Sequence, residues 1–215
     1  MNCCNQCQGI EDLFNTRLAE DDLRAYRKNG PSKQTRLLLD TLRAVGVEGL
    51  TLLDIGGGIG AIQHELMKSG LAVTIDVGAS SAYLSAAKEE AARQGYADRA
   101  RYFHGNFIDL APGLENADIV TLDRVICCFP DMGAMVSLSA TRAKRWYALV
   151  YPRDTWWMRM GGRVGNFVLA LGRSKFRFFV HPAQAVDSLV RANGLQPHFQ
   201  RNTGLFWQVV VYGRN

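Results

Sequence analysis

Apolar positions recur with helical spacing in two stretches near the start of the chain. The first is an irregular amphipathic stretch over residues 11–28, and the helix breaker Asn29-Gly30-Pro31 ends it. The second begins at Ser32, carries leucines about one turn apart, and ends at Gly46. We expect residues 1–45 to form an N-terminal helical cap.

From residue 51 the pattern changes to short apolar runs that alternate with helical segments. The runs predict five strands, over residues 51–55, 71–77, 100–107, 117–125 and 145–152. The segments between them predict helices over residues 61–69, 80–94 and 131–142. Because strands and helices that alternate connect by right-handed crossovers, the pattern predicts a mostly parallel, doubly wound sheet.

The C-terminal part predicts a different arrangement. A helix over residues 182–192 precedes two apolar runs, 196–201 and 205–213, which only three residues separate. A link of three residues permits only a hairpin, and the last strand is therefore expected to run antiparallel to the strand before it. Residues 152–175 fall outside the alternation and form an apolar insertion. The expected fold is α/β, a Rossmann-like doubly wound seven-stranded sheet over residues 46–215 with an antiparallel C-terminal hairpin.

Composition narrows the class of protein further. The 215 residues are 47% hydrophobic and 21% charged, with a net charge of +5, which describes a globular chain. The sequence contains no run of about 20 apolar residues, which is the length that a membrane span requires. The first 14 residues lack the apolar core of a signal peptide, so we expect a cytoplasmic protein. The five cysteines are an odd number, which argues against a disulfide scaffold.

A glycine-rich loop joins the first predicted strand to the next helix, in the order Asp54-Ile55-Gly56-Gly57-Gly58-Ile59-Gly60. Glycines there permit positive φ and close approach of a ligand to the backbone. Asp76 follows Asp54 by 22 residues, at the end of the second strand, where a carboxylate accepts ribose hydroxyls. This pattern suits both NAD and S-adenosylmethionine. A carboxylate at Asp54 favours a ligand with an ammonium and a sulfonium over a pyrophosphate, unless Asp54 only caps a turn.

With these motifs the chain resembles the class I S-adenosylmethionine-dependent methyltransferases. The segment 54–60 is similar to their first motif, 105–107 to their adenine segment, and 122–125 to their strand-four motif. Residues 123–131 and 147–157 more loosely resemble the bacterial magnesium-protoporphyrin O-methyltransferase-like group. The resemblance covers about residues 46–215. It implies that S-adenosylmethionine is the cofactor and that seven residues bind it: Asp54, Gly56, Gly58, Asp76, Asn106, Phe107 and Asp123.

One of these positions departs from the family pattern. Many members carry Asp where this chain has Asn106. The Asn carbonyl oxygen still accepts a hydrogen bond from an adenine amino group, and the alternative is a cap on the turn after strand three. Asp123 has an alternative too, an ion pair with Arg124.

The reacting groups are expected at the carboxyl ends of strands four and five, within 123–131 and 151–157. His181, Tyr151 and Arg153 are the candidate catalytic residues. His181 is a candidate general base or anion ligand, with an exposed capping histidine as the alternative. Cys127 and Cys128 are either small buried residues or thiols that line the substrate pocket.

The insertion 152–175 is rich in bulky apolar residues, and we expect the glycines at 161, 162 and 165 to interrupt it. It either packs on the core as a helical hairpin or closes as a hinged lid over an apolar or aromatic substrate. Its four arginines are Arg153, Arg159, Arg163 and Arg173. They are expected to bind substrate carboxylates or an anionic membrane surface, or to face solvent.

The functional hypothesis is methyl transfer from S-adenosylmethionine to a hydrophobic or aromatic small molecule. The alternatives are an NAD-binding oxidoreductase and a non-catalytic cofactor-binding or metal-binding protein. Cys4 and Cys7 have a metal-compatible spacing, but the sequence has no second Cys/His pair at zinc-finger distance, and we predict no metal site. A net charge of +5 and the lack of a base-flipping motif argue against a nucleic-acid substrate.

Overall fold

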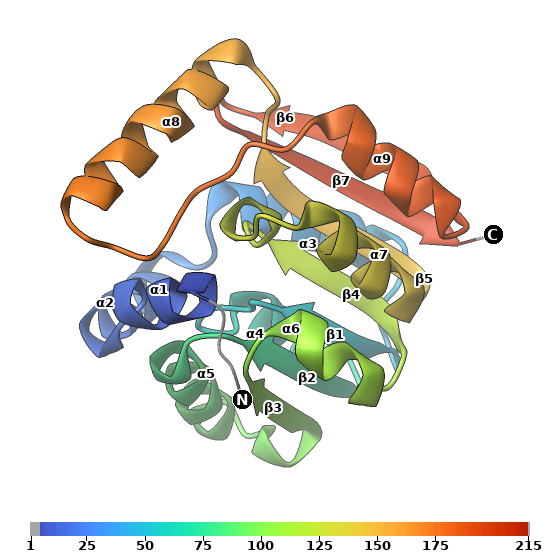
Figure 1. The fold of residues 1–215 in the computed structure, drawn as a ribbon. Coiled ribbons are helices and arrows are strands. Elements are labelled where there is room, and N and C mark those ends of the chain that lie inside the picture. The colour runs from blue at the N-terminus through green and yellow to red at the C-terminus, as the bar shows by residue number, and fades with distance from the viewer. Residues whose placement is uncertain (1–4, 215) are drawn as a thin grey trace.

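The computed structural model describes residues 5–214, and a seven-stranded sheet runs through its centre (Figure 1). The strand order is β3-β2-β1-β4-β5-β7-β6, with β7 antiparallel to both of its neighbours and the other pairs parallel. The strands are β1 (Thr51–Ile55), β2 (Val73–Gly78), β3 (Ala100–His104), β4 (Ala117–Asp123), β5 (Ala143–Pro152), β6 (Leu195–Thr203) and β7 (Trp207–Arg214). The expected Rossmann-like sheet with a C-terminal hairpin is confirmed.

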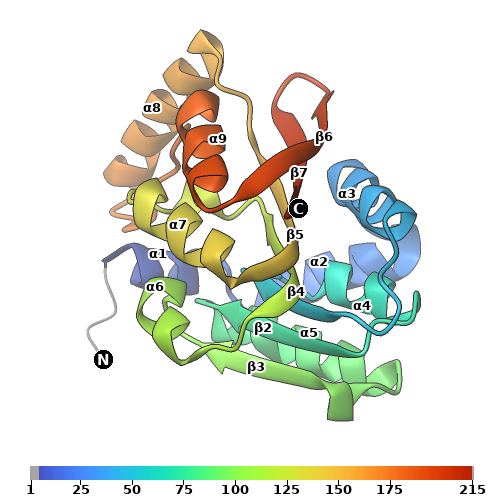
Figure 2. The ribbon, with the colours of Figure 1, turned by 90° about the vertical axis from the view of Figure 1, so that its right-hand side faces the viewer.

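Helices cover both faces of the sheet (Figure 2). One face packs against α3 (Lys33–Ala44), α4 (Ala61–Met67) and α5 (Ser81–Arg93), and the other against α6 (Phe107–Leu110), α7 (Met132–Arg142) and α9 (Ala183–Ala192). The central strands read as continuous apolar runs because parallel strands are buried on both faces. Three short 3-10 helices complete the connections: η1 (Ala97–Arg99), η2 (Ala111–Gly113) and η3 (Ile126–Cys128).

The predicted single helical stretch 11–28 is wrong, because the chain forms two helices here, α1 (Asn5–Leu13) and α2 (Thr16–Asn29). The Asn15 side chain accepts a hydrogen bond from the backbone N–H of Leu18 at 3.2 Å and so starts α2. The two helices lie across the edge of the sheet at which the parallel strands end (Figures 1 and 2).

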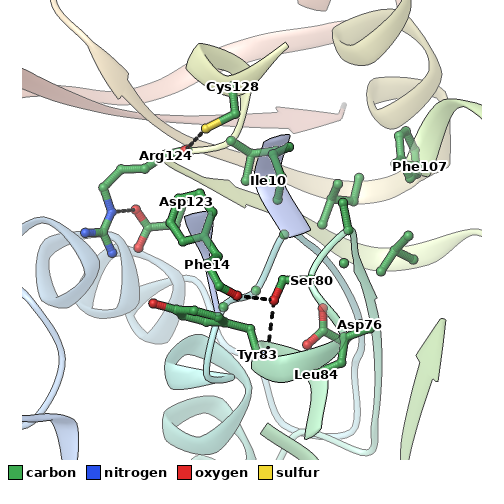
Figure 3. A pocket seen from close by; sticks show the side chains of 18 of the residues that line it. Ile10, Phe14, Asp76, Ser80, Tyr83, Leu84, Phe107, Asp123, Arg124 and Cys128 are labelled. Atoms are coloured by element: carbon green, nitrogen blue, oxygen red, sulfur yellow. Dashed lines mark hydrogen bonds and ion pairs between the residues drawn. The ribbon is translucent and has the colours of Figure 1, made fainter. Parts of the chain in front are cut away.

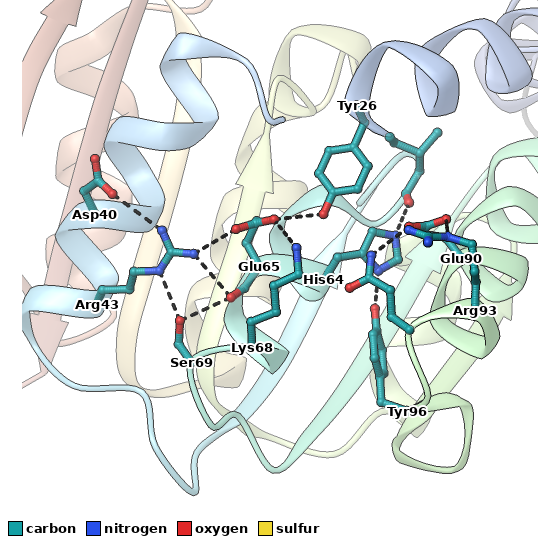
Figure 4. Close-up of polar contacts among 12 residues, drawn as sticks. Tyr26, Asp40, Arg43, His64, Glu65, Lys68, Ser69, Glu90, Arg93 and Tyr96 are labelled. Atoms are coloured by element: carbon teal, nitrogen blue, oxygen red, sulfur yellow. Dashed lines mark hydrogen bonds and ion pairs between the residues drawn. The ribbon is translucent and has the colours of Figure 1, made fainter. Parts of the chain in front are cut away.

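Polar side chains hold α2 and α3 to the helices of the sheet (Figure 4). Tyr26 Oη donates to Glu65 of α4 at 2.9 Å, and Arg43 of α3 pairs with the same carboxylate at 3.0 Å. His64, next to Glu65, is fully buried, and burial lowers its pKa to about 4. His64 is therefore neutral near pH 7 and serves the packing of α4.

The insertion forms one continuous helix, α8 (Trp156–Leu171), so the predicted interruption at its glycines is wrong. Gly162 lies on the inner side of this helix, where a Cβ atom would make an ordinary contact with the Phe178 ring at 3.4 Å. The chain then returns through residues 176–180 without helix or strand structure, and Phe179 N–H donates to the Cys127 carbonyl at 2.7 Å.

Candidate active site

A cavity of about 380 Å³ lies at the carboxyl ends of β1, β2 and β4 (Figure 3). This is the edge of a doubly wound sheet at which ligands bind. The glycine loop and the ends of β2 and β4 form its floor, and α1 and the return segment 176–180 contribute apolar side chains. The volume is in the range of small-molecule sites.

The glycine loop fits its place only without side chains. Gly56 and Gly58 have φ values of 64° and 61°, which L-residues rarely adopt. A Cβ atom on Gly56 would lie 2.7 Å from Val125 Cγ2, and one on Gly57 would overlap the Asp54 carboxylate. The loop therefore brings bare backbone to the cavity, as close approach of a cofactor requires.

Asp54 and Asp76 lie opposite each other on β1 and β2, and both are fully buried. Gln63 Nε2 bridges them, donating to Asp54 at 3.2 Å and to Asp76 at 2.7 Å. Burial raises the pKa of Asp54 to about 6, although hydrogen bonds from Thr121 and Gln63 act in the opposite direction. Burial, together with the neighbouring Asp54, raises the pKa of Asp76 well above its ordinary value.

Asp76 also lines the cavity, two residues before the end of β2. Its Oδ1 atom is buried and accepts no hydrogen bond from any residue that the structure describes. A buried carboxylate oxygen without a partner is costly, because it has lost its water. A ligand hydroxyl in the cavity would satisfy this atom, so the site fits the ribose expected there.

At the end of β4, Asp123 and Arg124 form the rim of the cavity. Asp123 accepts from Thr35 Oγ1 at 2.5 Å and from Arg124 Nε at 2.9 Å, so both carboxylate oxygens are held. Arg124 has a φ of 62°, a strained value for a residue with a side chain. Such strain is typical of functional loops, and here it turns the chain sharply into η3.

Cys127 and Cys128 follow on η3 and line the cavity. Both thiols lie near the Arg124 carbonyl, at 3.2 Å and 3.6 Å. A hydrogen bond with Cys128 and burial raise the pKa of Cys127 well above its ordinary value. The thiol of Cys127 is therefore protonated at neutral pH and is a poor nucleophile.

The N-terminal cap closes one side of the cavity with aromatic contacts. Phe14 lies between Tyr83 and Phe176, with ring centroids 5.6 Å and 6.0 Å apart in edge-to-face geometry. The Gln6 side chain donates to the Cys128 carbonyl at 2.7 Å and accepts from Arg177 N–H at 3.1 Å. The cap is thus bound both to α5 and to the segment 176–180.

Several lining residues were not among the sequence-based candidates, and most are apolar or aromatic. They are Ile10, Phe14, Asp22, Ser80, Tyr83, Phe129, Phe176, Phe178 and Trp207. Phe129 lies within the segment 123–131, where reacting groups were expected, while the others come from distant parts of the chain and belong to no motif. Apolar spacing predicted a packed helix at Phe14, with no indication of a pocket.

Five of the expected cofactor residues meet at the cavity: Gly56, Gly58, Asp76, Phe107 and Asp123. Asp54 lies behind the loop, buried against Gly57. The expected strand over residues 100–107 ends at His104, because Asn106 caps α6 by accepting from Ile108 N–H at 3.2 Å. The Asn106 side chain also donates to Asp109 at 3.2 Å, outside the lining that the structure describes.

The three candidate catalytic residues lie away from the described cavity lining. His181 Nε2 donates to the carbonyls of Ile126 and Phe129, each at 2.9 Å, so it holds the loop that carries the cysteines. Tyr151 is buried within β5. Arg153 binds the β6–β7 turn, with its backbone N–H donating to the Phe206 carbonyl at 2.8 Å.

Two features are absent from the described residues 5–214. No helix there is both long and apolar enough to cross a bilayer. No group of three or more His, Cys, Asp or Glu side chains in this range is placed to hold a metal ion. Cys4, of the expected metal-compatible pair, lies outside the described residues.

Comparisons with known structures reveal the same architecture. Magnesium protoporphyrin IX methyltransferase from Synechocystis PCC 6803, solved with S-adenosylhomocysteine, is 18% identical with a TM-score of 0.72, over 98% of this chain and 100% of that one. An O-methyltransferase family protein from Burkholderia thailandensis is 17% identical with a TM-score of 0.71, over 96% of this chain and 63% of that one. At such identities the likeness shows a shared fold.

The family is shown by the sequence itself. The model of the O-methyltransferase domain matches residues 3–142, which include the cap, the glycine loop and the cysteine pair at the cavity. No curated protein sequence gives a significant match. The chain belongs to the O-methyltransferase family, which confirms the resemblance to class I S-adenosylmethionine-dependent methyltransferases.

Proposed function

We propose that the protein transfers a methyl group from S-adenosylmethionine to an oxygen atom of an apolar or aromatic small molecule. The observation that carries this proposal is the composition of the cavity beyond the glycine loop. Phe14, Phe129, Phe176 and Phe178 line that part, and few charged groups accompany them. Such a surface favours a flat apolar substrate, because ring faces and edges pack well against one another.

The cofactor would occupy the part of the cavity next to the glycine loop. Gly56 and Gly58 would hold its methionine portion, and the free Oδ1 of Asp76 would accept a ribose hydroxyl. Phe107, after β3, would contact the adenine. Asp54 would act from behind the loop, by holding Gly57 in place and by its charge.

S-adenosylmethionine supplies an electrophilic methyl group on a sulfonium when it is bound. The chain would align the acceptor oxygen with that methyl group and keep water out of the site. Phe14, which follows α1, and Phe176, which follows α8, would serve both purposes. His181 is a positioning residue in this scheme, because its Nε2 proton is engaged with two backbone carbonyls.

Structural neighbours support a small-molecule substrate. An O-methyltransferase family 2 protein from Planctomyces limnophilus, 14% identical with a TM-score of 0.64, was solved with the flavone apigenin. A geranyl diphosphate C-methyltransferase from Streptomyces coelicolor A3(2), 14% identical with a TM-score of 0.68, was solved with geranyl diphosphate. Both ligands have large apolar parts, as the phenylalanine-lined cavity requires.

Calorimetric titration tests the cofactor, with S-adenosylhomocysteine and NAD as the two ligands. We expect S-adenosylhomocysteine to bind and NAD to give no heat. Asp76→Ala should weaken binding at least about tenfold, because one ribose hydrogen bond to a carboxylate is lost. Binding of NAD alone, or an unchanged affinity in Asp76→Ala, would overturn the assignment.

Mass spectrometry tests the reaction. The protein is incubated with S-adenosylmethionine and a library of phenols and apolar carboxylic acids, and products heavier by one methylene unit are sought. We expect methyl ethers or methyl esters. A protein that binds the cofactor but modifies no member of a broad library would support the non-catalytic alternative.

A further inference from the structure

Helix α8 packs on the body with one face and turns a broad apolar face to solvent. At 3.6 residues per turn, its half-buried residues recur on the inner side: Met158, Gly162, Asn166 and Leu169. Large apolar residues cover the opposite side and are each more than half exposed: Trp156, Met160, Val164, Phe167, Val168 and Leu171. We call this set the outer face of α8. It reverses the usual arrangement, in which the apolar face of a surface helix is buried.

A second exposed apolar group lies at the same end of the molecule. Leu205 and Phe206 form the turn between β6 and β7 and are 65% and 54% exposed. The hydrogen bond from Arg153 N–H to the Phe206 carbonyl ties this turn to the chain just before α8. In Figures 1 and 2 both α8 and the turn lie at the top of the molecule. Contiguous apolar surface of this kind indicates an interaction site.

The charge of this region is strongly positive. Residues 153–177 contain six basic residues and one acidic residue, a net charge of +5 that equals the net charge of the whole chain. Asp154 pairs with Arg159 at 2.7 Å, while Arg163 and Arg173 form no ion pair within residues 5–214. Arg159 and Arg163 are one helical turn apart and border the outer face. The partner of this surface must therefore be both apolar and anionic.

We propose that the outer face of α8, together with the β6–β7 turn, binds the surface of an anionic phospholipid bilayer. The helix would lie in the plane of the interface, with Trp156 and Phe167 among the acyl chains and arginines at the phosphates. The geometry matches a helix that lies on a membrane, because exposed apolar residues cover one side of α8 and arginines border that side. A second copy of the chain fits less well, because this face would then bring two strongly positive regions together.

The membrane surface would also connect to the cavity. Phe178 lines the cavity, and its backbone N–H and carbonyl bind the Asn166 side chain of α8 at 2.8 Å and 2.7 Å. An apolar substrate dissolved in the bilayer would thus lie next to the wall of the site. Membrane binding itself does not depend on the proposed methyl transfer and can be measured without it.

Co-sedimentation of the full chain with vesicles tests the proposal. Phosphatidylcholine vesicles are compared with vesicles that also contain phosphatidylglycerol, and tryptophan fluorescence of the same samples reports insertion of α8. We expect binding to the anionic vesicles and at least about tenfold weaker binding to phosphatidylcholine alone. Met160→Glu combined with Phe167→Glu should lower the anionic partition coefficient at least about tenfold, because two inserted side chains become charged.

Two further variants make the outcome specific. Leu18→Glu places a carboxylate on an exposed apolar residue of α2, 37% exposed, and should leave vesicle binding unchanged. Arg163→Gln should weaken anionic binding about fivefold. The proposal is overturned if the anionic vesicles do not bind, or if the Met160/Phe167 double variant binds as the wild type does. It is equally overturned if the chain forms a dimer that this double variant abolishes while lipid binding is absent. Binding of S-adenosylhomocysteine should be the same in all these variants, which separates this test from that of the proposed function.

Discussion

At the scale of single residues, the pair Asp54 and Asp76 dominates the electrostatics of the site. Both side chains are fully buried on neighbouring strands, and one amide, that of Gln63, donates to both. Such an arrangement is unfavourable when both groups are ionised, because like charges repel strongly in a medium of low dielectric constant. The pair therefore keeps its protons to a higher pH than free carboxyl groups do, as the raised pKa values of both residues indicate.

This pair makes the stability of the protein depend on pH in an unusual direction. The pKa of Asp54 is about 6 in the folded chain and near its ordinary value of 3.8 when unfolded, so the folded state binds more protons between these values. Asp54 by itself should therefore lower the free energy of unfolding by about 2–3 kcal/mol as pH rises from about 4 to 6, whereas His64, whose pKa burial lowers to about 4, acts in the opposite direction over the same range. Urea unfolding across this range is the measurement.

Asp54→Asn removes the contribution of Asp54 and keeps that of His64, so its free energy of unfolding should rise more steeply between about pH 4 and 6 than that of the wild type. Asp40→Asn, on the exposed side of α3, is the matched control and should keep the wild-type slope. An Asp54→Asn protein whose free energy of unfolding follows the wild-type pH profile would contradict the assignment.

At the scale of elements, the N-terminal cap is joined to the sheet at several points. Glu11 accepts from Ser81 N–H at 3.1 Å and binds His104 Nε2 at 3.0 Å. Burial alone would raise the pKa of Glu11, but its bonds with Ser81 and His104 outweigh burial and lower that pKa. Tyr83 Oη donates to Asp22 of α2 at 2.6 Å, so α5 holds both cap helices. The N-terminal helices α1 and α2 therefore form an ordered wall of the cavity.

Phe14→Ala should open this wall. We expect the KM for an aromatic acceptor to rise roughly tenfold, because the acceptor loses a ring contact of about 0.5–1.5 kcal/mol with a side chain that Tyr83 and Phe176 hold in place. Steady-state kinetics with the acceptor identified by mass spectrometry give the measurement. Leu13→Ala, one residue earlier and 37% exposed, is the control and should leave KM unchanged. Equal effects of the two substitutions would mean that Phe14 does not contact the substrate.

At the scale of the whole molecule, the cavity is closed by parts of the chain that are far apart in sequence. Helix α1 and the segment 176–180 meet through Gln6 and Arg177, more than 170 residues apart. These peripheral parts bury less apolar surface than the central strands, and segments of this kind open most easily. Ligand binding in the cavity should therefore stabilise them most.

Hydrogen exchange followed by mass spectrometry tests this expectation. Saturating S-adenosylhomocysteine should slow amide exchange in residues 5–30 and 176–180, while strand β6, which contributes no residue to the cavity lining, keeps its exchange rate. The same experiment with NAD is the control and should change neither region. Protection of β6 alone would place the ligand elsewhere on the fold.

The strands and the glycine loop could be predicted from the sequence because their signals are local. Each buried strand is a continuous apolar run, and the loop glycines at 56 and 58 stand where the backbone needs positive φ. The family resemblance implied Asp76, Phe107 and Asp123, because each stands at a fixed place relative to the end of a strand, and all three line the cavity. Strand periodicity also predicted the antiparallel hairpin, since three residues cannot form a crossover.

Other features depended on contacts between distant residues. Nothing local distinguishes Phe14 or Phe178, which line the cavity, from any other apolar residue. The sequence made His181 a candidate general base. In the structure its Nε2 donates to the backbone carbonyls of Ile126 and Phe129, more than 50 residues earlier in the chain. The glycines at 161, 162 and 165 predicted a break in the insertion, but α8 runs through all three.

The sequence by itself determined the sheet, its order of strands and helices, and the glycine loop, since backbone preference and apolar periodicity act over a few residues. Only the tertiary structure decided which aromatic side chains line the cavity and which face of α8 remains in solvent. The physical reason is that burial is a property of the folded whole. A side chain of given hydrophobicity lines a cavity, fills the core or faces solvent according to what the rest of the chain places against it.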